Sequence, residues 1–205
     1  MAEIVLPSPH DKEEIENLAR ALGPQEMKTL ADMLEEKDDK LRYPAFLLLQ
    51  ARSGQNGDLM PFWNTFAGKL QSENSYSRSI GLMLLAANAR WADGGQLEGI
   101  IDSYLNLLED VKPITVRQCI QGLYEIIPCG EKVRGKIARQ LLSFDVMSIR
   151  ETMRKSVLGD ILGALLLLRK YDATPEIESY MHRALAGSLL DAKAKKELKE
   201  KLQNP

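Results

Sequence analysis

The sequence predicts an all-α protein in which helices stack in pairs as an α-α superhelix. Three observations lead to this prediction. Leucine and alanine are abundant while aromatic residues make up 6% of the 205 residues, which favours helices over sheets. Capping residues, prolines and glycines recur at short intervals, and no stretch alternates apolar and polar residues between turn signals. An arginine also recurs near the start of every second expected helix, which is typical of a helical repeat.

Capping residues and apolar spacing define the helices of the first half. Ser8-Pro9 resembles an N-cap followed by a first-turn proline, and the helix that it opens is expected to end near Gly23. Pro24 starts the next helix. Pro44 is expected within the first turn of the third helix, where a missing N–H costs little. The expected ranges are 8–23, 24–37, 41–52, 58–70 and 75–91.

The second half shows the same punctuation. The glycine pair Gly94-Gly95 separates two helices, Pro113 opens another, and Pro128 is expected to close it. Thr174 caps the tenth helix, and Ser188 is expected to open a final helix rich in lysine and glutamate. The expected ranges are 96–109, 113–127, 131–143, 147–170, 174–187 and 188–203, which brings the count to about eleven helices.

The arginine repeat is the most informative pattern. It recurs at intervals of 36 (42 to 78), 39 (78 to 117) and 37 (117 to 154) residues, each time followed by small and leucine-like residues. One helix pair cannot bury its apolar face alone, so each pair is expected to stack on the next. The inner helices then approach each other closely and need small residues. The repeated arginines are Arg42, Arg78, Arg117 and Arg154, and the small residues are Ala45, Gly81, Gly122, Gly159 and Gly163.

This inner-helix pattern and its length resemble those of the HEAT and armadillo-like repeat families. The resemblance covers 24–187 of a single domain spanning 1–205, with 1–23 as an N-terminal cap and 188–205 as a C-terminal capping helix. It implies a HEAT-like solenoid of about five helix pairs. HEAT units often carry an aspartate about six residues before the arginine. Glu36 fits that offset, whereas Ser72, Val111 and Ser148 do not.

Composition and charge narrow the function classes. The formal net charge is −2, and the sequence pI is about 5.8, so no global basic field is present to hold nucleic acid. The longest apolar run, 161–168, is far shorter than the roughly 20 residues that cross a bilayer, so no membrane association is expected. The first residues do not resemble a signal peptide, and Cys119 and Cys129 give no disulfide framework. A cytoplasmic protein is therefore expected.

The sequence offers no convergent catalytic set. His10 and His182 have no partner at metal-ligand spacing and are expected in surface or capping roles. Cys119 is expected to be buried on an inner helix, and Cys129 to be exposed in a turn. No glycine-rich phosphate loop is present. We therefore assign no catalytic residue, metal ligand or cofactor, and we expect a protein that is not an enzyme.

The leading hypothesis is a protein-protein interaction or scaffold module that holds an unidentified protein on the concave face of the solenoid. The repeated arginines are expected to bond loop carbonyls and carboxylates, with a contribution to the groove as the alternative. Trp91 is a candidate exposed anchor. Asp160 interrupts an apolar helix; we expect it to face the groove, and the alternative is a pair with a base of the neighbouring repeat. The other expected groove residues are Tyr43, Gln50, Ser79, Gln118, Gln121, Glu125 and Lys155.

A second hypothesis comes from another class. HEAT-like DNA glycosylases, which repair alkylated bases, are similar in size and architecture, and Trp91, Asp160 and the arginines could take the aromatic, acidic and basic roles there. The acidic pI and the neutral groove side chains argue against this hypothesis. Lyase or chaperone activity toward a cofactor-bearing protein, known for some HEAT-like families, is a third possibility that no residue supports directly.

Overall fold

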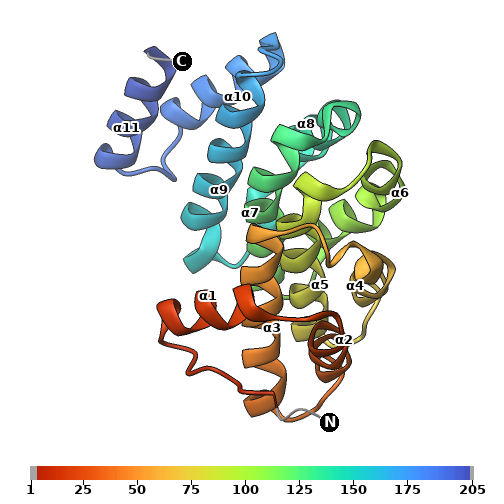
Figure 1. Cartoon of the computed structure of the whole chain (residues 1–205). Helices are drawn as coiled ribbons and strands as arrows, with labels where there is room; N and C mark the ends of the chain where they lie inside the picture. The colour runs from red at the N-terminus through yellow and green to blue at the C-terminus, as the bar shows by residue number, and fades with distance from the viewer. Residues whose placement is uncertain (1–3, 204–205) are drawn as a thin grey trace. The chain divides into compact units, whose positions relative to one another are not determined.

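The computed structural model describes residues 4–203, and within that range every element of secondary structure is a helix, without a β-strand (Figure 1). The all-α prediction is therefore confirmed. Eleven α-helices and five short 3₁₀ turns make up the described residues. They pack as two compact units that divide between Asp93 and Gly94.

The first unit is built around one long helix, α3. Helices α1 (Lys12–Ala21) and α2 (Pro24–Met33) both pack on α3 (Asp39–Gln55), which in turn packs on α5 (Ser75–Asn88). A 3₁₀ turn, η1 (Met60–Phe62), leads into α4 (Trp63–Lys69), which covers α5, and a second turn, η2 (Ala89–Trp91), follows α5.

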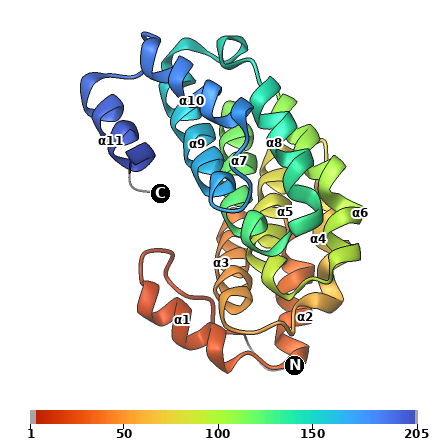
Figure 2. The same cartoon turned by 90° about the horizontal axis from the view of Figure 1, so that it is seen from above.

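The second unit is built around the pair α7 (Pro113–Cys129) and α9 (Glu151–Arg169), which pack on each other. Helix α8 (Arg134–Ser143) packs on α9, and α10 (Pro175–Ala186) contacts both α8 and α9. In both views α11 (Ala192–Gln203) lies beside α9 and α10 (Figures 1 and 2). The remaining elements are α6 (Gly94–Leu105), η3 (Asn106–Glu109), η4 (Glu131–Val133) and η5 (Val146–Ser148).

Close approach between helices explains two of the small residues. A Cβ atom built on Gly81 of α5 would lie 2.9 Å from the backbone oxygen of Phe66 in α4. A Cβ atom on Gly163 of α9 would lie 2.3 Å from the hydroxyl oxygen of Tyr124 in α7. Gly159 differs, because a Cβ atom there would meet no atom within 4 Å. The expectation of close packing therefore holds at Gly81 and Gly163 and is wrong at Gly159.

Several helix ends differ from the sequence-based expectation. The first helix begins at Lys12, because the N-cap is Asp11, whose carboxylate accepts the Glu14 N–H at 2.9 Å. Likewise the last helix begins after Asp191, whose carboxylate accepts the Ala194 N–H at 2.9 Å. In both cases a carboxylate caps the helix instead of the upstream serine.

Two prolines lie inside helices rather than at their ends. Helix α3 begins at Asp39, two residues before the expected start, so Pro44 lies beyond the first turn. Helix α7 continues through Pro128 to Cys129. Both prolines are within six residues of an end, where few intrahelical hydrogen bonds depend on them.

Candidate partner-binding face

The candidate site is the side of the second unit where α7 and α9 meet. Its centre is an ion pair between Arg117, in the second turn of α7, and Asp160, halfway along α9. The Arg117 Nε lies 2.6 Å from one Asp160 carboxylate oxygen, and Nη2 lies 3.3 Å from the other. The side chains are 27% and 14% exposed. The hydrogen bond to Asp160 is the main reason that the pKa of Arg117 is raised.

Two further side chains of α7 hold the same segment of α9. Gln121 donates from Nε2 to the Asp160 carboxylate at 3.2 Å. One turn later, the Tyr124 hydroxyl donates to the Asp160 backbone oxygen at 2.7 Å. Burial, followed by the charge of Asp160, raises the pKa of Tyr124 to about 12. Arg117, Gln121 and Tyr124 therefore fix one turn of α9 through three separate contacts.

Around this network the two helices present polar side chains. Gln121 and Glu125 are exposed on α7, and Lys155 is exposed at the start of α9, where its Nζ pairs with the carboxylate of Asp191. Gly159 contributes open space next to Asp160. We call these five residues — Gln121, Glu125, Lys155, Gly159 and Asp160 — the inner face of the second unit. They offer hydrogen-bond donors, acceptors and both signs of charge.

Asp160 requires a correction. The sequence favoured an aspartate facing the groove, with pairing to a neighbouring base as the alternative. The structure shows the pair, with Arg117 from the preceding repeat position. The physical reason is the small exposed fraction of the side chain, 14%, at which a carboxylate needs a compensating charge and hydrogen bonds.

The remaining predicted residues of the second unit are also placed. Gln118 is half-buried on α7, one residue after Arg117. Arg154 donates to two carbonyl oxygens of the turn that precedes its own helix, those of Ile149 at 2.9 Å and Met147 at 3.0 Å. This arginine thus stabilises the entry to α9.

In the first unit the predicted residues do not form one comparable face. Tyr43 is 39% exposed, stacks on Phe46 and lines a cavity of about 630 Å³ together with the N-terminal segment. Gln50 is half-buried, and Ser79 is buried, with 6% of its surface exposed. The expectation that Ser79 lines a groove is not supported, because serine is small enough to sit within the helix packing of α5.

Trp91 is partly exposed, as expected, at 42%. Its indole Nε1 donates to the backbone oxygen of Ser53 at 2.7 Å, and its ring lies against Gly57, where an added Cβ would be 3.1 Å away. The ring thus anchors the end of the unit to the turn after α3. Trp63 is almost fully buried, at 3% exposure.

The arginines of the first unit make structural contacts. Arg42 pairs with Asp39 and lies 4.3 Å from the ring centroid of Tyr76 in α5, a cation–π contact. Arg78 donates to the backbone oxygens of Ser72 at 2.8 Å and Glu73 at 2.9 Å.

The cysteines and histidines have the expected exposure, but Cys129 is the last residue of α7 rather than part of a turn. Cys119 is buried and Cys129 exposed, and burial raises the pKa of the Cys119 thiol well above its usual range. His10 and His182 are exposed. Within residues 4–203, no group of three or more His, Cys, Asp or Glu side chains is arranged to hold a metal ion. None of the helices described for this chain is both long and apolar enough to cross a membrane.

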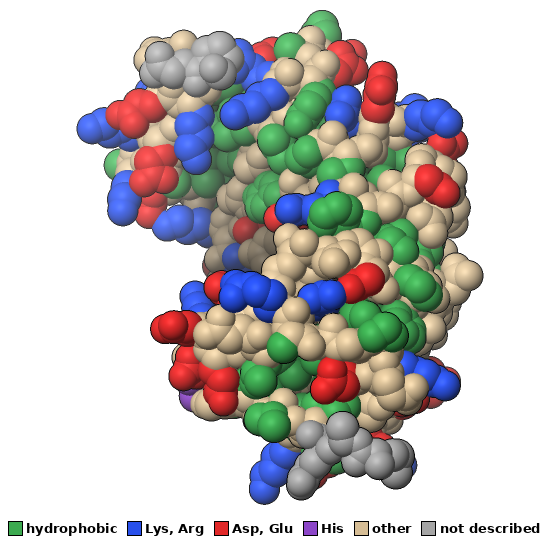
Figure 3. Space-filling model, viewed as in Figure 1, with side chains coloured by type: hydrophobic (Ala, Val, Ile, Leu, Met, Phe, Trp, Pro, Cys, Tyr) green, Lys and Arg blue, Asp and Glu red, His purple; other side chains and the backbone are tan. Residues whose placement is uncertain are grey.

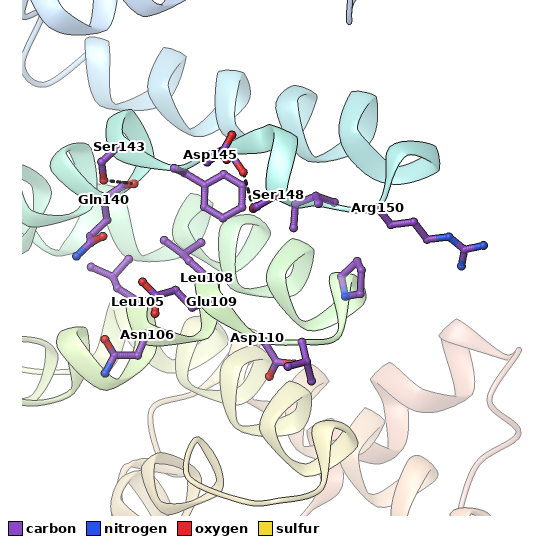
Figure 4. A pocket seen from close by; sticks show the side chains of 14 residues that line it. Leu105, Asn106, Leu108, Glu109, Asp110, Gln140, Ser143, Asp145, Ser148 and Arg150 are labelled. Atoms are coloured by element: carbon purple, nitrogen blue, oxygen red, sulfur yellow. Dashed lines mark hydrogen bonds between the residues drawn. The ribbon is translucent and has the colours of Figure 1, made fainter.

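A cavity of this unit lies at its turns. The turn before α7 and the turn before α9 enclose a cavity of about 710 Å³ (Figure 4). Its carboxylates also cap turns: Asp110 accepts the Lys112 N–H at 2.8 Å, and Asp145 accepts the Met147 N–H at 2.9 Å. In Figure 4 the Arg150 side chain points away from the other labelled residues. Turn formation therefore explains Asp110 and Asp145.

Sequence reasoning missed Tyr124 as a member of the site. It follows Gln121 by three residues and Arg117 by seven, so all three occupy one face of α7. That spacing was the available signal. Gly163, which lies against the Tyr124 hydroxyl, was identified in the sequence as a small residue of its helix. The sequence did not reveal that contact, because Tyr124 belongs to another helix.

Comparisons with known proteins bear on the fold alone. No family model matches the sequence, and no curated protein matches it. Among solved structures, the crystal structure of an engineered protein from the Northeast Structural Genomics Consortium is similar, with a TM-score of 0.54 and 16% sequence identity. The match covers 97% of this chain and 93% of that chain. The similarity therefore concerns the arrangement of helices, and it assigns no family or activity.

Proposed function

We propose that this chain is a non-enzymatic module that binds another protein on the inner face of its second unit, in a HEAT-like solenoid. The main observation behind this proposal is that hydrogen bonds hold the Asp160 carboxylate in one position. Because Arg117 and Gln121 both hold it, the turn of α9 next to Gly159 is a rigid surface element. A rigid, preorganised surface loses little conformational entropy when a partner binds.

The residue types of the inner face fit a polypeptide partner. An extended chain presents alternating N–H and C=O groups, and a glutamine side chain has both a donor and an acceptor. The Nε2 of Gln121 donates a hydrogen bond to Asp160, which orients the amide group, and the Gln121 side chain is exposed to solvent. Gly159 permits the backbone of a partner to approach α9 without a side chain between them.

The solenoid is supported by the arginine period and by the packing of α3 on α5 and of α7 on α9. In a HEAT-like repeat such consecutive inner helices stand side by side. The cytoplasmic location expected from the sequence stays a prediction.

Site-specific photo-crosslinking tests this function. A photoreactive phenylalanine derivative would replace Gln121 or Glu125 on the inner face and, as a matched control, the exposed Arg139 on α8. In extract of the source cells we expect one discrete adduct from the inner-face positions and none from position 139. Adducts of equal yield at all three positions, or none at positions 121 and 125, would contradict the proposal.

A further inference from the structure

A groove runs along the final turns of α9 beside α11. Its volume is about 760 Å³. The floor is formed by Gly163, Leu166 and Leu167 of α9, and the rim carries Arg169, Lys170 and, from α11, Lys201. Leu166 and Leu167 are only half-buried, so the floor keeps accessible apolar surface. Such surface gains free energy when an apolar group covers it.

The charged residues that line this groove are all cationic. The Nε of Arg169 pairs with Glu178 of α10, so that charge is offset. Lys170 and Lys201 are exposed, and neither forms a salt bridge with a residue of the described range 4–203. Figure 3 shows Lys and Arg side chains gathered over α11, with Asp and Glu between them. The groove thus combines an apolar floor with two cations available for a partner.

The wall that α11 provides is fixed in place. At its start, Asp191 caps the helix and pairs with Lys155 of α9. Leu198 of α11 and Leu190, which precedes the helix, are buried, at 5% and 6% exposure. The ion pair at the helix start ties α11 to α9, and α11 also packs on α10.

The groove continues the inner face. Lys155, Gly159, Gly163, Leu167 and Lys170 follow one another on α9 at spacings of four, four, four and three residues. Each residue of this series is a surface neighbour of the next, and the series winds gradually around α9. A ligand that crosses the inner face along α9 therefore reaches Leu167 and Lys170 next.

From these observations we propose that the groove between α9 and α11 binds an acidic, amphipathic peptide segment of the partner protein. Apolar side chains of the segment cover Leu166 and Leu167, and its carboxylates pair with Lys170 and Lys201. The inference rests on the proposed function and specifies the chemistry of its partner. A peptide fits better than a single-carboxylate amphiphile, because the two lysines lie on different helices and the stripe extends toward Lys155.

Fluorescence anisotropy with the full chain tests the inference. The probe is a fluorescein-labelled peptide in which pairs of glutamates alternate with pairs of leucines, and its control has lysines in place of the glutamates. We expect binding of the acidic probe that weakens as salt is raised, and no binding of the basic one. Equal binding of both probes, or no binding of the acidic probe, would overturn the inference. So would a result in which the protein binds dodecanoate but does not bind the acidic peptide.

Variants locate the binding. The double variant Lys170→Gln/Lys201→Gln is expected to raise the Kd of the acidic probe about tenfold, and Leu166→Ala to raise it by about threefold. The matched control is Lys112→Gln/Lys199→Gln, which removes two exposed lysines outside the groove and leaves the Kd unchanged. An equal rise in the control would refute the location. If the acidic probe does not bind in the groove but the photoreactive residue at position 121 still forms its adduct, the acidic-peptide inference is wrong. The proposed protein-binding function would then still hold.

Discussion

The two units contain the same arginine-led helix pattern but join the helices that carry it by different chemistry. In the first unit, Arg42 lies over the ring of Tyr76, and α3 and α5 are linked by a buried hydrogen bond of 2.7 Å from Asn88 to Ser53. In the second unit, Arg117 meets the carboxylate of Asp160, which is partly exposed. Across the helix pair, an aromatic ring thus contacts the repeated arginine in the first unit and a carboxylate contacts it in the second, while the carboxylate that pairs with Arg42, Asp39, comes from the arginine's own helix.

The largest expected effect comes from adding a methyl group at the two tight glycines. Gly81→Ala brings a Cβ against the Phe66 backbone oxygen, and Gly163→Ala brings one against the Tyr124 hydroxyl. We expect each to lower the free energy of unfolding by about 1–3 kcal/mol, measured by urea denaturation. The matched control Gly159→Ala meets open space and should be neutral or stabilising, by up to about 1 kcal/mol.

A second substitution distinguishes the two tight sites. Tyr124→Leu removes the atom that Gly163→Ala meets, so the double variant should recover most of the lost stability relative to Tyr124→Leu alone. No side-chain change can relieve Gly81→Ala in this way, because its nearest atom belongs to the backbone of α4. Additive losses in the Tyr124→Leu/Gly163→Ala variant would show that the contact does not limit α7–α9 packing.

Double-mutant cycles measure the difference in chemistry directly. The cycle of Arg117→Gln with Asp160→Asn should give a coupling energy of about 1 kcal/mol that decreases as salt is raised. The cycle of Arg42→Gln with Tyr76→Leu should give about 0.5–1 kcal/mol with a weaker salt dependence. If the two cycles respond to salt in the same way, the contrast between the units is wrong.

The smallest expected effect concerns Asp191 at the start of α11. The hydrogen bond from Lys155, then that from the Ala194 N–H, holds the pKa of Asp191 below its ordinary value of 3.8. A lowered folded-state pKa stabilises the protein above pH 3.8, and that contribution is lost as the pH falls through the lower folded value. NMR titration of the carboxyl carbon should show the pKa rising in Lys155→Gln; an unchanged pKa would mean that the pair does not form in solution.

Local signals in the sequence were sufficient for the number and order of the helices in the described residues, but insufficient for some helix ends and for the site. Asn74 and Thr174 cap helices through side-chain contacts within three residues, so their effect is visible in the sequence. Gly159 and Gly163 look alike in the sequence, yet only Gly163 faces a tyrosine, which lies 39 positions earlier on α7 (124 to 163). Asp160 was misassigned for the same reason, because its partner comes from another helix.

The positions of the two tryptophans allow the unfolding of the two units to be followed by different spectroscopic signals. Trp63 and Trp91 are its only tryptophans, and both precede the division at Asp93. Tryptophan emission therefore reports on the first unit, while far-ultraviolet circular dichroism reports on the helices of both. If the units melt together, the two signals will trace one transition; separate midpoints would show two cooperative blocks, and a peptide bound at α9 would then shift only the dichroism curve.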